Sequence, residues 1–173
     1  MPAFSSDALP QDQALHAGAE RLRHAVAELP LRYAPFFTRL AGLWQVTEDR
    51  VLGELLRAKD PKSWRLTLLR GLKTFEVDLG RPAAAQRSHL LHFAPALRFP
   101  QHSHHGPERV LVLEGSYADA SGLEVRAGDE QTMAAGSEHE LNILGNVPCV
   151  AAVTEHGISF ITPWLRRARR LLR

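Results

Sequence analysis

The stretch FPQHSHHGPERVLVLEGSY (residues 99–117) joins a cluster of histidines to an almost unbroken apolar run. Successive side chains of a β-strand point to opposite faces, so His102 and His104 are expected to share a face. Glu108 has the same parity, although the residues between them can bend the chain. In the apolar run, residues 110 and 112 fall on the face of Glu108, and residues 111 and 113 fall on the other. Both faces of this strand must therefore be covered.

Two imidazoles and a carboxylate form a common nitrogen-and-oxygen ligand set for a divalent transition metal. A fourth candidate is His139 in GDEQTMAAGSEHELN (residues 128–142), just past a glycine where a turn can redirect a strand. We therefore predict that His102, His104, Glu108 and His139 converge on one ion. The alternative interpretation is a histidine-rich surface loop. His105 has the opposite parity and is expected to face outward.

The pattern of apolar residues changes near Trp64, from helical spacing before it to short β-like segments after it. Residues 11–59 show helical spacing of apolar residues, with Thr47 as an N-cap before an acidic first turn. The apolar stripe predicted after this turn consists of Val51, Leu52, Leu55 and Leu56. From Trp64 onward, short β-like segments alternate with Gly-, Pro- and Asp-rich turns, which favours an antiparallel barrel or sandwich. The predicted organisation is an α-helical N-terminal segment (1–60), a metal-binding β domain (61–163) and a basic C-terminal tail (164–173).

Composition and charge narrow the functional classes. The formal net charge is +2, but the last ten residues hold five arginines and no acid, which leaves −3 for residues 1–163. A mildly acidic body gives no support to general nucleic-acid binding. The lone cysteine, Cys149, excludes a disulfide framework and is expected to be a buried, inert thiol. No segment reads as a signal peptide or a membrane span, so a cytoplasmic protein without membrane attachment is expected.

The spacing His-x-His-x3-Glu-x6-Gly, ending at Gly115, resembles the first motif of the cupin superfamily. The second cupin motif, G-x5-P-x-G-x2-H-x3-N, is similar to the segment with Gly128, Gly136 and His139. Ala134 replaces the usual proline, and Asn142 comes one residue early. The resemblance implies a mainly β fold, the cupin double-stranded β-helix or jelly-roll barrel, with the helical segment in front of it.

Within the cupins, residues 85–162 most resemble the cupin-like domain of ChrR-type anti-sigma factors. This resemblance implies a zinc-binding sensory module that controls transcription under oxidative stress, with the two motif-1 histidines, Glu108 and His139 as ligands. ChrR proteins also carry a separate sigma-binding domain whose zinc is held by His-x3-Cys-x2-Cys. That segment is absent from this sequence. The resemblance therefore suggests anti-sigma activity without carrying it over.

Three functions stay open at this point. The first is the regulatory module, holding one divalent transition metal that is zinc, or alternatively Fe, Mn or Ni. Its expected partners are a sigma factor or other regulatory protein and a small-molecule ligand, with a homodimer as an option. The second is an Fe-dependent cupin dioxygenase, although the sequence near the motifs offers no substrate-fixing arginine or tyrosine. The third is a helix-turn-helix regulator, which Glu48 and Asp49 oppose because they would open its recognition helix.

Overall fold

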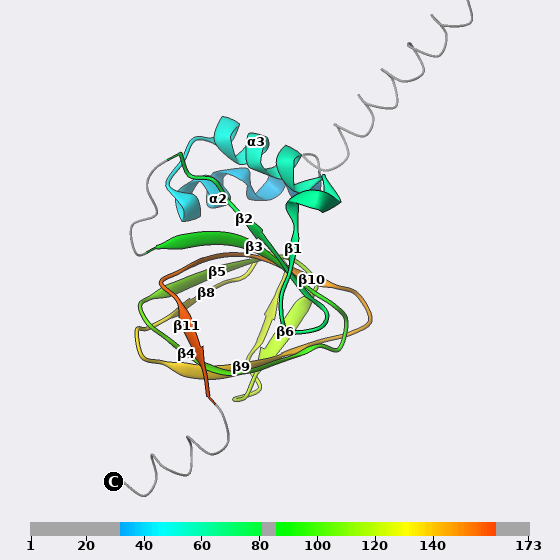
Figure 1. The fold of residues 1–173 in the computed structure, drawn as a ribbon, viewed down its shortest axis with the longest axis vertical. Helices are drawn as coiled ribbons and strands as arrows, with labels where there is room; N and C mark the ends of the chain where they lie inside the picture. The colour runs from blue at the N-terminus through cyan, green and yellow to red at the C-terminus, as the bar shows by residue number, and fades with distance from the viewer. Residues whose placement is uncertain (1–31, 81–85, 162–173) are drawn as a thin grey trace, which may run out of the picture.

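The β-like segments form two antiparallel sheets in the computed structural model, which describes residues 32–80 and 86–161. In spatial order, the six-stranded sheet contains β1 (Arg65–Leu66), β2 (Leu72–Glu76), β3 (Arg87–Phe93), β10 (Cys149–Glu155), β5 (Glu108–Glu114) and β8 (Glu130–Met133). The five-stranded sheet contains β11 (Ile158–Phe160), β4 (Arg98–His104), β9 (Glu138–Ile143), β6 (Ser116–Asp119) and β7 (Glu124–Arg126). The two sheets face each other as a barrel (Figure 1). The predicted mainly β jelly roll is confirmed.

The apolar run of β5 divides between two cores, as its alternation predicts. Val110 and Val112 belong to a cluster between the two sheets, together with side chains from both. Leu111 and Leu113 belong to a second cluster on the outer face of the six-stranded sheet. Helices cover that outer face (Figure 1), so β5 is buried on both sides.

A β-bulge near the end of β5 changes this alternation. Val112 pairs with Ala151 and Glu114 pairs with Val150, so β5 advances two residues while β10 advances one. The extra residue turns Glu114 to the helical side, where it meets Tyr33. Gly115 follows with φ of +66°, and a Cβ there would lie 2.4 Å from the Pro148 carbonyl oxygen. Only glycine fits this position, which gives the cupin-motif glycine a steric reason.

The helical layer consists of η1 (Ala34–Phe36), α2 (Phe37–Trp44), α3 (Glu48–Ala58) and η2 (Pro61–Ser63). The predicted cap of α3 is present: the Thr47 hydroxyl accepts a hydrogen bond from the Arg50 amide. Val51 and Leu55 are fully buried, and they pack this layer onto the sheet, the arrangement of a helical cover. The helix expected over residues 11–29 and the basic tail lie outside the described residues. Among the described residues, no helix has the length and apolarity needed to cross a membrane.

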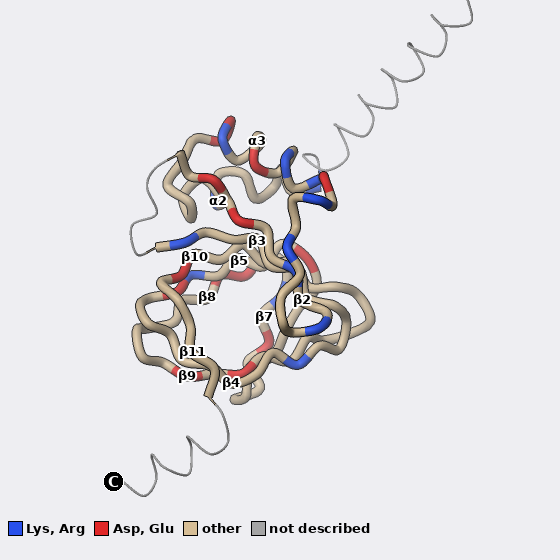
Figure 2. Tube along the Cα trace, in the orientation of Figure 1, with Lys and Arg blue, Asp and Glu red and all other residues tan. Residues whose placement is uncertain are grey.

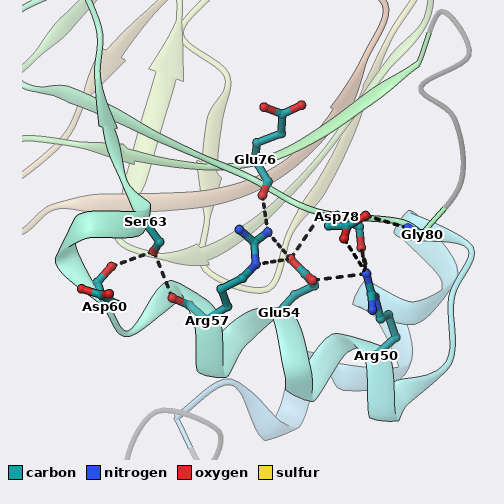
Figure 3. Close-up of polar contacts among 8 residues, drawn as sticks. All are labelled: Arg50, Glu54, Arg57, Asp60, Ser63, Glu76, Asp78 and Gly80. Carbon is teal, nitrogen blue, oxygen red and sulfur yellow. Dashed lines mark hydrogen bonds and ion pairs between the residues drawn. The ribbon is translucent and has the colours of Figure 1, made fainter.

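Glu54 fastens α3 to the sheet, a role that the apolar pattern of the helix does not predict. The residue is only 4% exposed. Figure 3 shows Glu54 between two arginines of the same helix, Arg50 and Arg57. Glu54 Oε2 also accepts the amide of Asp78 at 3.1 Å, just past the end of β2. Arg57 in turn lies over the Phe75 ring, 4.3 Å from its centroid. The predicted apolar stripe was wrong here, because Leu52 and Leu56 are only half-buried while this acid is buried.

Candidate metal centre

Two histidines of β4 and one of β9 meet inside the barrel. His102 and His104 alternate along β4 onto the same, interior face, and their side chains are buried. His139 is the register partner of His102 on the neighbouring strand β9, so the two rings lie side by side. Their Nε2 atoms are 2.9 Å apart. Ligand atoms of all three histidines lie within 4.8 Å of one another, so this part of the site converges as the spacing predicts.

Glu108 reaches the histidines from the opposite sheet. The sequence argument gave it the strand parity of His102, but β4 ends at His104 and Glu108 begins β5. The chain crosses from one sheet to the other between them, through Gly106, where a Cβ would lie 2.7 Å from the His156 side chain. Glu108 Oε2 ends 2.6 Å from His104 Nδ1. Three strands from two sheets therefore bring the four predicted residues together.

The protonation of the rings suits metal binding. His102 Nδ1 lies 2.9 Å from the Pro100 carbonyl oxygen. Because a carbonyl can only accept, this nitrogen carries the proton, and Nε2 presents a lone pair to the centre. Burial lowers the pKa of His102, and burial together with the neighbouring rings lowers the pKa of His139 to about 4. Both rings are thus neutral at neutral pH, the form that coordinates a metal.

Several polar atoms of the centre lack protein partners, which tests whether a metal fits. His139 Nδ1 and both ring nitrogens of His104 are buried without a hydrogen bond, so the short Glu108 contact lacks hydrogen-bond geometry. An unsatisfied buried polar group costs about 1–3 kcal/mol. A cation can take one nitrogen from each ring together with the carboxylate, so it would satisfy one of the two His104 nitrogens and remove part of that cost. The donor set, three imidazoles and one carboxylate, fits a divalent transition metal.

A cavity of about 440 Å³ opens beside the histidines. Its walls are mostly apolar, but Arg87, His89, Tyr117 and Glu155 add polar groups. His89 Nε2 lies 3.2 Å from Glu155 Oε1, and the Tyr117 hydroxyl donates to Gln131 Oε1 at 2.6 Å. Arg87 and Tyr117 thus lie in the cavity wall, although the sequence near the motifs offers no obvious substrate-fixing arginine or tyrosine. These side chains come from β3, β6 and β10, which sequence spacing does not connect to the motifs.

The remaining histidine of the cluster lies outside the centre, as its parity predicts. His105 is exposed, and its Nε2 lies 2.6 Å from the Ser159 hydroxyl. Cys149 is buried, also as expected, and burial raises the pKa of its thiol to about 12.

Comparisons with known proteins agree with this architecture. Residues 59–158 match the model of the ChrR Cupin-like domain family. No curated protein matches the chain. The crystal structure of Rhodobacter sphaeroides SigE in complex with the anti-sigma ChrR is 26% identical over 53% of this chain and 47% of that chain, with a TM-score of 0.47. The match thus spans less than half of that solved chain.

Two other solved structures are similar in fold at low identity. One is an acetylacetone dioxygenase from Acinetobacter johnsonii, 14% identical over 65% of this chain and 88% of that chain, with a TM-score of 0.52. The other is an RmlC-like cupin protein from Ralstonia eutropha, 14% identical over 63% of this chain and 79% of that chain, with the same TM-score of 0.52. They support the barrel architecture alone.

Proposed function

The chain belongs to the ChrR cupin-like domain family, and from this premise we propose that it is a metal-binding regulatory module of anti-sigma type. The metal-binding domain would comprise residues 61–163. Its ligands would be His102, His104, Glu108 and His139. The convergence of three histidines, two buried and one half-buried, carries the proposal. His104 and His139 also have ring nitrogens without a hydrogen bond.

Zinc is the metal that this donor set favours in our proposal. Three imidazole nitrogens and one carboxylate oxygen can close a tetrahedral shell, which is the usual arrangement of a non-catalytic zinc site. The hydrogen bond from His102 Nδ1–H to the Pro100 carbonyl oxygen fixes the orientation of the ring, as hydrogen bonds to the outer nitrogen of metal-binding histidines commonly do. Iron, manganese and nickel are the alternatives, because nitrogen-and-oxygen sites accept each of them.

Regulation would require a signal and a partner. In our proposal, an oxidant or a small-molecule ligand changes the centre, and the change alters binding to a sigma factor or another regulatory protein. The family of the domain supports this role. The cavity beside the histidines supports a small-molecule signal, since its volume of about 440 Å³ lies in the range of known ligand sites.

The same cavity favours a second candidate function, an iron-dependent dioxygenase. Such an enzyme needs a pocket that holds the substrate next to the metal. The cavity reaches His102, His139 and Glu108, and the contact between the His89 ring and the Glu155 carboxylate lies in its wall. In this alternative, the chain would bind and orient the substrate with that pair, while the apolar walls exclude water from the centre.

Metal analysis of protein purified without added metal separates the two candidates. The regulatory module predicts close to one zinc per chain, retained through dialysis, and the dioxygenase predicts labile iron together with oxygen consumption. Glu108→Gln is expected to weaken zinc binding, because a neutral amide is a poorer ligand than a carboxylate. Unchanged affinity would remove Glu108 from the ligand set, and protein without any bound metal would contradict both candidates.

A further inference from the structure

A second cavity, of about 510 Å³, lies on the other face of the six-stranded sheet from the metal centre. Its floor includes Leu90 and Val150, outward-facing residues of β3 and β10. Its roof includes Leu55 of α3. Because the sheet separates it from the histidines, this outer cavity is distinct from the site described above.

Trp64 gives the outer cavity a fixed aromatic wall. Its indole Nε1–H donates to the Ala58 carbonyl oxygen at 2.7 Å, which anchors the ring to the end of α3. The ring also packs against Phe75 and against the edge of His92, with centroid distances of 5.7 and 6.2 Å. Three contacts hold this ring in place, so a flat ligand would meet a surface that is already organised.

Positively charged side chains outnumber negatively charged ones around the outer cavity. It is lined by Arg32, Lys59 and Lys73, against a single acid, Glu114. Glu114 is already engaged, because it pairs with the Arg32 guanidinium and accepts the Tyr33 hydroxyl. Neither lysine has an acidic partner within the part of the chain that the structure describes. Figure 2 shows further basic positions along the segment that leads from α3 into β1. The cavity therefore keeps two uncompensated positive charges.

We propose that the outer cavity binds a small amphipathic anion, with an aromatic or other flat apolar body against Trp64 and a carboxylate or sulfonate beside Lys59 and Lys73. The apolar floor supplies the burial that favours the body of such a ligand. The two ammonium groups supply the charge that selects an anion over a neutral molecule. The volume suits a ligand of one to three rings.

A matched pair of fluorescent probes tests the proposal on the whole 173-residue chain as purified. The anionic probe is 8-anilinonaphthalene-1-sulfonate, and the neutral probe is N-phenyl-1-naphthylamine, which has the same rings without the sulfonate. We expect saturable binding of the anion, with tryptophan-to-probe energy transfer that falls in Trp64→Phe, where only the other two tryptophans of the chain remain as donors. The double substitution Lys59→Gln and Lys73→Gln is expected to weaken the anionic probe about tenfold and to leave the neutral probe within about twofold.

Three controls make the outcome decisive. Lys62→Gln removes an exposed lysine of η2 that does not line the cavity, and it should leave both affinities unchanged. Lys59→Arg with Lys73→Arg keeps the charge and should keep the binding. Circular dichroism and thermal melting verify the fold of each variant. Anion binding that survives the loss of both lysines, or the absence of saturable binding to the wild-type protein, would overturn the proposal.

Discussion

The two sides of the six-stranded sheet each carry an apolar cluster but arrange their polar groups differently. Both sides have some buried side-chain atoms without a hydrogen bond, but among the described residues only the barrel side brings three possible metal ligands together. On the outer face, the buried carboxylate of Glu54 is held by arginines and a backbone amide, and Glu114 is held by Arg32 and Tyr33. In the barrel interior, His104 of β4 and His139 of β9, on the facing five-stranded sheet, keep buried ring nitrogens without hydrogen bonds. Satisfied polar groups fasten one layer to another, whereas unsatisfied groups that converge on one point indicate a ligand.

His104→Ala tests the inner face and should have the largest effect. The substitution removes one of four proposed ligands, so we expect zinc affinity to fall by about 1000-fold or more and the melting temperature to fall with it. The metal content per chain reports the loss of zinc, and calorimetry reports the melting temperature. His105→Ala is the matched control, because that neighbouring histidine is exposed and should leave the metal in place. Equal metal content in the two variants would contradict the assignment of the centre.

Glu54→Ala tests the outer face and should affect stability without affecting the metal. The change leaves the Asp78 amide without its acceptor and separates Arg50 and Arg57 from their shared carboxylate. We expect the free energy of unfolding in urea to fall by about 2–3 kcal/mol, with zinc stoichiometry unchanged. Asp49→Ala, an exposed acid in the first turn of the same helix, should cost less than about 1 kcal/mol. Loss of zinc in Glu54→Ala would mean that the two faces are not independent.

Tyr33→Phe and Tyr117→Phe compare one buried tyrosine on each face. The Tyr33 hydroxyl donates to Glu114, and the Tyr117 hydroxyl donates to Gln131 in the barrel. Each substitution should cost about 1 kcal/mol at neutral pH. Burial raises the pKa of both tyrosines above the usual value of about 10, and Glu114 raises that of Tyr33 further.

The sign of the alkaline pH dependence follows from these raised pKa values. Above about pH 10 the unfolded chain releases tyrosine protons that the folded protein still binds, so stability should fall as pH rises. Each phenylalanine variant should lose part of this alkaline decline in urea denaturation measured from pH 7 to pH 11. A decline of unchanged slope in both variants would assign it to other groups.

The alternation of apolar residues explains why much of the barrel could be predicted. Val110 and Leu111 could be placed on opposite faces because strand periodicity depends only on the local chain. The same reasoning placed His102 and His104 together, and it required only that residues 98–104 be extended. Strand alternation holds within one element, which is why these predictions agree with the structure.

Features that depend on pairing between distant segments could not be predicted. Strand parity could not place Glu108, which lies on the opposite sheet, because parity across a bend carries no information; the resemblance to the first cupin motif named the same residue. His89 and Tyr117 enter the barrel cavity from strands whose neighbours only the topology defines. Glu54 is polar in an amphipathic helix, so its burial depends on Asp78, twenty-four positions away. The local sequence around a buried acid cannot predict a partner that lies so far away in the chain.

Cys149 should give the smallest effect of all, because its thiol lies on the barrel side of the sheet and is expected to be unreactive in the folded protein. Its side chain is buried in the core between the sheets, and burial raises the pKa of the thiol to about 12. At pH 7 the thiol therefore stays protonated, and the thiolate is the reactive form. A thiol reagent should label the folded protein only as fast as the chain opens, and the rate should rise sharply in urea. Rapid labelling of the native protein would instead make Cys149 a candidate for the oxidant signal, which in our proposal belongs to the metal centre.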